Sequence, residues 1–171
     1  SADDIKKYVA GFLSNSRGDE AYTYGERLKS FPLEGYSNDI LNVVQHLIKD
    51  GGEQEFIDLL KSSIQNKRFN QQAILANKLK SFPENKGAIA ILWEPIIDNF
   101  GLREIWRTPC LVLVQAVIRD KRLFLTAYFR SNDMYGGWFL NVFGLLAFQK
   151  ELAGMIGKDI KLGPLTTFSH S

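Results

Sequence analysis

The single cysteine of this 171-residue chain is its side chain with the greatest nucleophilic potential. Cys110 follows Pro109 and directly precedes a run of apolar residues that predicts a β-strand. A thiol at a strand edge can be held with its sulfur open to a cleft, and it reacts as a thiolate where a cation lies nearby. The alternative is that Cys110 is a small buried hydrophobic residue.

A cation is expected close to this cysteine. Apolar runs at 111–118 and 123–129 are separated by the polar residues RDKR, which predicts a β-hairpin. Pairing of the two strands brings Arg130 to the Cys110 end of the sheet, where its guanidinium can stabilise a thiolate and bind a phosphate. The alternatives are that Arg130 is a surface cation and that Asp133 only caps the helix that follows.

The two histidines do not suggest a site. His46 and His170 lie far apart in the sequence, and one cysteine with two histidines is too few for a standard zinc site. The sequence also lacks a glycine-rich phosphate loop of the P-loop type and a G-x-G-x-x-G motif. We therefore expect no metal.

The elements that must position these residues follow from hydrophobic spacing. Helices are predicted at 3–13, 38–49, 54–65 and 69–82, and a buried strand at 87–93 precedes the hairpin. Residues 134–154 predict one long apolar helix. Helices first, then strands, then a buried helix against the sheet indicate an α+β fold.

Composition places the chain among ordinary globular domains. Hydrophobic residues make up 45% and charged residues 23%, and the net charge is +2. These values exclude disorder, and the charge is too small to suggest a nucleic-acid partner. The longest strongly apolar stretch, 138–148, is too short to span a bilayer, and the first residues lack a secretory signal. We expect a single cytoplasmic domain without a membrane contact.

Three motifs together resemble the thymidylate synthase family. They are TPCLVLVQ, FRSND and GGWFLN, in this order and at these spacings, with TYGER and NKGAIAILW upstream. The wording RSND and the W-x-P-I-I-D stretch are most similar to the archaeal branch. The resemblance implies a thymidylate-synthase-like fold, in which a mixed β-sheet packs against a long buried helix with further helices around it.

The resemblance also implies a methyltransferase that converts dUMP to dTMP. Cys110 would attack C6 of the pyrimidine and so activate C5 toward a one-carbon unit. Arg130 and Ser131 would hold the phosphate, and Asn141 would bind the base edge and favour uracil. Tyr24 would help proton transfer.

Further residues follow from the same resemblance. Asp133 would hold both the base region and the pterin, Gln115 and Gly137 would line the nucleotide site, and Lys86 would reach the phosphate of a partner chain in a homodimer. The one-carbon donor would be 5,10-methylene-tetrahydrofolate or methylene-tetrahydromethanopterin.

Departures from the family pattern leave two alternatives open. Leu111 stands where the family has His, and Leu145 stands where it has Tyr. One alternative is a pyrimidine-nucleotide C5 hydroxymethylase of the same superfamily, and the other is a nucleotide-binding paralogue without catalysis. The family's phosphate-binding Arg and catalytic Glu would precede residue 1, and its His-x-Tyr would follow residue 171. We therefore expect residues 1–171 to be one catalytic domain that is incomplete at both ends.

Overall fold

The computed structural model describes residues 1–16, 22–32, 37–100 and 108–170. The helices are α1 (Ala2–Leu13), α2 (Tyr24–Lys29), α3 (Ser37–Lys49), α4 (Gln54–Asn66), α5 (Gln71–Ser81), α6 (Pro95–Phe100) and α7 (Trp138–Ile156). The strands are β1 (Phe31–Pro32), β2 (Arg68–Phe69), β3 (Ile89–Ile91), β4 (Leu111–Arg119), β5 (Arg122–Phe129) and β6 (Lys161–Ser169).

One four-stranded sheet organises the molecule. Its strand order is β3-β4-β5-β6, with two antiparallel pairs followed by the parallel pair β5-β6, so the sheet is mixed. The β4-β5 hairpin turns at Asp120 and Lys121, which both have positive φ values (49° and 57°). This left-handed geometry matches the twist of paired strands. The predicted hairpin and the α+β class are both confirmed.

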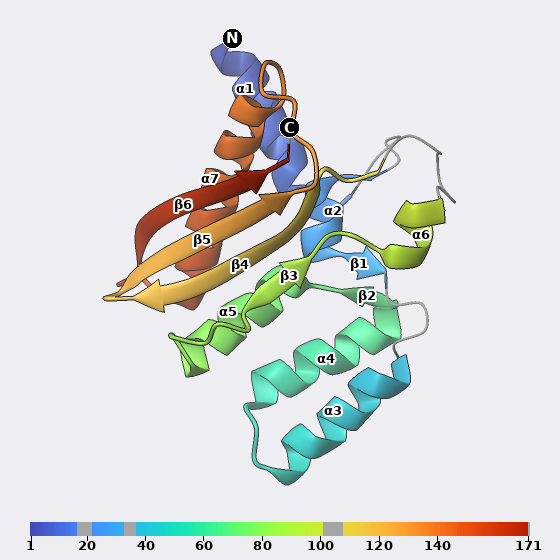
Figure 1. Ribbon diagram of the computed structural model, residues 1–171. Helices are drawn as coiled ribbons and strands as arrows, with labels where there is room; N and C mark the ends of the chain where they lie inside the picture. Colours follow the sequence, from blue (N-terminus) through green and yellow to red (C-terminus); the bar gives the residue numbers. More distant parts are fainter. Residues whose placement is uncertain (17–21, 33–36, 101–107, 171) are drawn as a thin grey trace.

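The core lies between this sheet and the helices α1, α5 and α7 (Figure 1). Alternate residues of β5, namely Leu123, Leu125, Ala127 and Phe129, are buried on that face. The fully buried residues of α7 that meet them are Leu145, Phe148 and Leu152. Gln149 is also fully buried, and its Nε2 donates to the carbonyls of Leu123 and Gly163, which ties the helix to β5 and β6.

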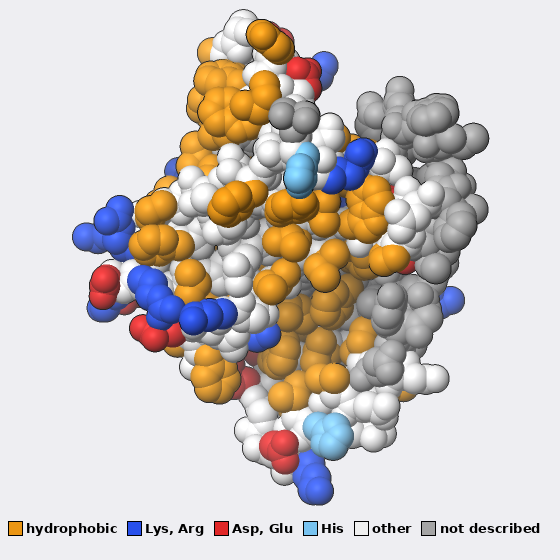
Figure 2. Space-filling model, in the orientation of Figure 1, with side chains coloured by type: hydrophobic (Ala, Val, Ile, Leu, Met, Phe, Trp, Pro, Cys, Tyr) orange, Lys and Arg blue, Asp and Glu red, His pale blue; other side chains and the backbone are white. Residues whose placement is uncertain are grey.

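Among the described residues, no helix covers the opposite face of the sheet. Figure 2 shows apolar side chains gathered over the strands on this side. Ile89, Ile91 and Phe168 are 44%, 51% and 58% exposed. An apolar face of this kind is typical of a surface that another protein covers.

A side chain closes the outer edge of β3. Gln71 Nε2 donates to the Ile91 carbonyl at 2.7 Å, and Gln71 Oε1 accepts from the Ile91 N–H at 2.9 Å. The Ile89 N–H is used locally, by the Gly87 carbonyl at 3.0 Å. The first residue of α5 therefore takes the place of a further strand.

Helices α3 and α4 form a hairpin that extends away from the sheet (Figure 1). Val44, Ile57 and Leu60 make a second, small hydrophobic cluster there. The 50–82 segment, to which the sequence assigns no function, therefore consists of α4, the short strand β2 and α5.

Several predicted boundaries shift. The long helix begins at Trp138 rather than at 134, because residues 134–137 form a turn, and the strand at 87–93 shortens to Ile89–Ile91. Helix α5 begins at Gln71 because Arg68–Phe69 pairs with β1.

Strand β6 is not predicted at all. It contains Gly163 and Pro164, which weaken a strand pattern, and its register with β5 shifts between Leu123 and Leu125.

The length of α7 corrects a second expectation. Its 19 residues are long and apolar enough, by length and composition alone, to cross a membrane. The strongly apolar stretch noted in the sequence, 138–148, covers only part of this helix. The helix nevertheless packs against α1, α5, β5 and β6, and its inward residues belong to the main core. This packing is typical of the core helix of a globular domain.

Candidate active site

Cys110 lies at the open end of the β4-β5 hairpin. Its carbonyl accepts from the Arg130 N–H at 2.9 Å, so the expected proximity of Cys110 and Arg130 is confirmed. The thiol is free, half-buried, and packed against the main core. The residue therefore sits where a rigid core meets the surface.

The Arg130 guanidinium is held against the segment that carries Cys110. Its Nε donates to the Pro109 carbonyl at 3.0 Å, and its Nη2 donates to Thr108 Oγ1 at 2.7 Å and to the Thr108 carbonyl at 3.1 Å. The guanidinium carbon also lies 5.4 Å from the centre of the Trp93 ring. Arg130 remains exposed, so a fixed cation faces solvent beside the cysteine.

Three tyrosines surround the same place: Tyr8 of α1, Tyr22, and Tyr24 at the start of α2. The Tyr22 and Tyr24 ring centres are 5.9 Å apart, and Tyr24 lies 5.3 Å from Phe12 of α1. Gly25 allows this approach, since a Cβ there would lie 1.9 Å from the Ser14 carbonyl oxygen. We call Tyr8, Tyr22 and Tyr24 the tyrosine cluster.

Burial controls the ionisation of the tyrosine cluster. Burial, followed by the nearby Tyr22 and Cys110 groups, raises the pKa of Tyr8 to about 12. Burial likewise raises the pKa of Tyr24 far above its ordinary value, and Tyr22 and Cys110 add to the shift. The pKa of Tyr22 is raised in the same way. All three phenols are therefore protonated at neutral pH and can donate hydrogen bonds.

Asn141, on the first turn of α7, is 6% exposed and bound on both sides. Its Oδ1 accepts from the Tyr8 hydroxyl at 2.5 Å, and its Nδ2 donates to Asn132 Oδ1 at 3.2 Å. Asn132 Nδ2 in turn donates to Ser169 Oγ at 3.3 Å. An amide has two donor and two acceptor positions, so Asn141 keeps one N–H and one lone-pair position for a ligand.

Asp133 shapes the turn that precedes α7. Its Oδ1 accepts from the N–H groups of Tyr135 and Gly136 at 3.0 and 3.1 Å, and its carbonyl accepts from Gly137 and Trp138. The alternative that Asp133 caps the following helix is therefore wrong: the N-cap of α7 is Gly137, and the Asp133 side chain caps only the turn before it. Its carboxylate is exposed, as is Ser131, so both also face solvent at this end of the sheet.

Gln115 and Lys86 are not brought to this place within one chain. Gln115 lies five residues along β4 from Cys110 and donates to the Lys86 carbonyl at 2.5 Å. Lys86 precedes β3, near the hairpin turn at the other end of the sheet. Within one chain, the structure therefore does not bring these two residues together with Cys110.

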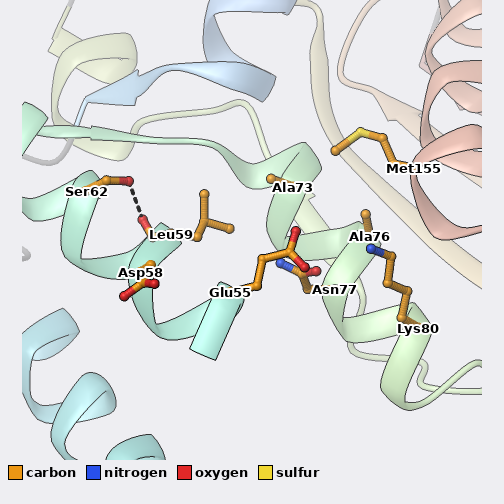
Figure 3. A pocket seen from close by; sticks show the side chains of 9 residues that line it. All are labelled: Glu55, Asp58, Leu59, Ser62, Ala73, Ala76, Asn77, Lys80 and Met155. Atoms are coloured by element: carbon orange, nitrogen blue, oxygen red, sulfur yellow. Dashed lines mark hydrogen bonds between the residues drawn. The ribbon is translucent and has the colours of Figure 1, made fainter. Parts of the chain in front are cut away.

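A separate hollow of about 390 Å³ lies between α4 and α5 (Figure 3). Leu59, Ala73 and Met155 contribute its apolar wall, and Glu55 of α4 and Asn77 of α5 point toward each other across it. It lies far from Cys110 and its lining contains no cysteine or histidine. Within the described ranges, no cluster of side chains suited to a metal ion is found.

Sequence analysis missed three of the residues that converge here. Tyr8 precedes the inward-facing Phe12 by four residues, a helical spacing that could have placed it on the same face of α1. Tyr22 and Asn132 lie outside helices and strands, and no pattern in the sequence indicates their roles.

Comparisons with known proteins identify the family to which the chain belongs. A family model described as thymidylate synthase matches residues 7–169. A Methanothermobacter marburgensis protein named "Putative thymidylate synthase" is 30% identical over 171 residues, covering 100% of this chain and 58% of that protein. The chain thus spans about three fifths of the length of such curated relatives.

Two further proteins are informative. Thymidylate synthase A from Bacillus subtilis superposes with a TM-score of 0.52 at 27% identity, over 61% of this chain and 35% of that one. The deoxyuridylate hydroxymethyltransferase of Bacillus phage SP01 is 34% identical over 62 residues, which are 36% of this chain and 16% of that protein. With the mixed sheet, the long core helix and the matched family model, these findings lead to one conclusion: the fold is thymidylate-synthase-like, and the chain belongs to the thymidylate synthase family.

Proposed function

We propose that this chain carries the Cys110-centred part of an active site that methylates dUMP, using a methylene-tetrahydropterin as co-substrate. The observation that carries the proposal is a set of contacts around Cys110. The Arg130 N–H donates to the Cys110 carbonyl, and Tyr24 is hydrogen-bonded with the backbone of the next residue, Leu111. Tyr8, which lies near Cys110, donates its hydroxyl to Asn141. The protein would act in the cytoplasm as a homodimer, as the family resemblance implies.

The nucleotide would be held at both ends. The exposed Arg130 guanidinium and the Ser131 hydroxyl would bind the phosphate, and the remaining N–H and lone pair of Asn141 would pair with O4 and N3–H of uracil. Both contacts would orient C6 toward the Cys110 sulfur. Addition of the thiolate to C6 makes C5 nucleophilic enough to accept a one-carbon unit.

Tyr24 would serve proton transfer. Its hydroxyl is buried, protonated and hydrogen-bonded with the Leu111 backbone, so it would hold a proton close to a nucleotide bound at Cys110. Lys86, with Gln115 behind it, would reach the phosphate from the partner copy of a dimer that forms through the open sheet face.

The pterin would supply the one-carbon unit and, in a synthase, the hydride. Asp133 is exposed and its Oδ1 accepts two backbone N–H groups of the turn, so Oδ2 is the oxygen that would accept from an N–H group of the pterin ring.

A hydroxymethylase remains the second candidate because of two residues. Leu111 and Leu145 are both fully buried, where the family resemblance leads one to expect His and Tyr. Loss of these polar groups would change how water reaches the one-carbon unit, and the matched segment of the phage SP01 relative supports this candidate.

The test is intact-protein mass spectrometry after incubation with 5-fluoro-dUMP and a methylene-tetrahydropterin. The fluorine blocks loss of the C5 substituent, so we expect a covalent adduct that disappears in Cys110→Ser. The mass of the product formed from dUMP itself then separates a methyl from a hydroxymethyl group.

Two results would count against the proposal. An adduct that persists in Cys110→Ser would assign the attack to another residue. Absence of an adduct, with dUMP still raising the melting temperature, would favour the nucleotide-binding paralogue. A longer chain that restores the adduct would instead show that residues outside 1–171 are required.

A further inference from the structure

Tyr8 and Asn132 hold the Asn141 amide from two sides, and neither is among the residues predicted from sequence. The three side chains come from α1, from the segment between β5 and the turn before α7, and from α7 itself, and Ser169 of β6 makes the last hydrogen bond of the series. Asn132 and Asn141 are 8% and 6% exposed, so their amides have few other partners. A buried hydrogen-bond chain of this kind restricts each member to a small set of orientations.

The orientation of this amide decides which base it can bind. Uracil presents an N3–H donor beside the O4 acceptor, whereas cytosine presents the N3 acceptor beside an amino donor. An amide rotated by half a turn exchanges Oδ1 and Nδ2, and so changes from a partner for one base to a partner for the other. An asparagine therefore discriminates only if its neighbours fix the amide.

From this geometry we infer that Tyr8 is a positioning residue that sets base specificity by fixing the Asn141 amide in one orientation. The inference rests on the proposed function, which places the base edge against Asn141. It extends that function by assigning the choice between uracil and cytosine to a residue that need not touch the nucleotide.

The direction of the hydrogen bonds is set at the Tyr8 end. If all these hydrogen bonds ran in the opposite direction, Asn141 would donate to the Tyr8 oxygen. The Tyr8 hydroxyl proton would then lose its amide acceptor. Tyr8 is largely buried and protonated, since burial raises its pKa to about 12. Ser169 is exposed, so its hydroxyl can donate to water or accept from water in either direction of the hydrogen bonds. The asymmetry therefore lies in Tyr8.

The test compares the affinities of dUMP and dCMP, measured by calorimetry, in the unmodified chain and in Tyr8→Phe. Tyr8→Phe removes only the hydroxyl. Loss of one orienting hydrogen bond should reduce the dUMP-over-dCMP preference roughly five- to tenfold. Tyr135→Phe is the matched control, because it removes a hydroxyl from a fully exposed ring. The preference of this variant for dUMP over dCMP should equal that of the unmodified chain.

A double variant tests the mechanism directly. In Tyr8→Phe with Asn132→Asp, the carboxylate can only accept from Asn141 Nδ2, so it should fix the amide from the other side and restore the preference. Melting temperatures recorded for every variant would identify any that fail to fold.

The outcomes separate the inference from the proposed function. The inference is wrong, and Tyr8 has only a structural role, if Tyr8→Phe weakens the binding of dUMP and dCMP equally. The same holds if the double variant does not restore the preference for dUMP. If the unmodified chain binds both nucleotides equally but still forms the Cys110 adduct, the inference is wrong and the proposed function stands. If it binds neither nucleotide, the proposed function fails, and the inference with it.

Discussion

At the scale of single residues, removing one partner of a buried ion pair outside the Cys110 site should be strongly destabilising. Arg27 Nη2 lies 2.8 Å from Asp98 Oδ1, and the two side chains are 1% and 4% exposed. Arg27 Nε and Nη1 are buried without a partner. Because removal of Asp98 would leave an uncompensated buried charge, we expect Asp98→Ala to lower the free energy of unfolding by about 3–5 kcal/mol in urea titrations.

Two controls define this prediction. Replacing both partners, with Arg27→Met and Asp98→Leu, should recover most of the lost stability, because no charge then remains buried. Asp159→Ala breaks the exposed pair with Lys121 and should cost less than about 1 kcal/mol. A similar cost for Asp98→Ala and Asp159→Ala would contradict the assignment.

The tyrosine cluster gives a pH prediction at the same scale. Its raised pKa values mean that the folded protein keeps phenol protons that the unfolded chain releases near pH 10. This stabilisation is fully present below pH 10 and is lost as the pH rises, for Tyr8 between about pH 10 and 12. The free energy of unfolding should therefore fall over this interval, and less steeply in Tyr8→Phe. A slope unchanged by this substitution would argue against a buried Tyr8.

At the scale of elements, the contact between α1 and α7 determines whether Tyr8 reaches Asn141. Gly144 makes this contact possible, because a Cβ there would lie 2.3 Å from Cδ2 of Phe12. Gly144→Ala should therefore push α1 outward, lower stability by about 1–3 kcal/mol and weaken nucleotide binding. Gly154→Ala, on the same helix with open space around it, should instead leave binding intact and raise stability slightly. Thermal unfolding and calorimetry on both variants would check this, and equal effects would refute it.

At the scale of the whole molecule, the open sheet face is the expected dimer surface. Phe168 is 58% exposed on this face, beside Tyr128 of β5. A charge buried in an apolar interface is unfavourable, so Phe168→Glu should convert the dimer to a monomer in analytical ultracentrifugation. Phe82→Glu alters a slightly more exposed ring (66%) outside the sheet and should leave the dimer unchanged. A monomeric unmodified chain would contradict the prediction outright.

How much could be predicted from the sequence also differs with scale. The hairpin, the long core helix and the Cys110–Arg130 proximity could be predicted, because each depends on local periodicity or on pairing between adjacent strands. Strand β6 could not, since it is parallel to β5 and contains a glycine and a proline within its nine residues. Tyr8 could not be assigned a role either, because its partner Asn141 lies 133 positions away in the chain.

The amide of Gln71 has a consequence for how the molecule behaves in a crowded solution. Exposed strand edges invite other chains to add to a sheet, which leads to domain exchange or fibres. At β3 the Gln71 side chain makes the two hydrogen bonds to Ile91 that a neighbouring strand would make. The outward N–H groups of Ile89 and Ile91 both have acceptors already. A strand from another molecule would find these two N–H groups already hydrogen-bonded. Addition of a strand at β3 would have to displace these hydrogen bonds, so one side chain at the start of a helix disfavours self-assembly at this edge.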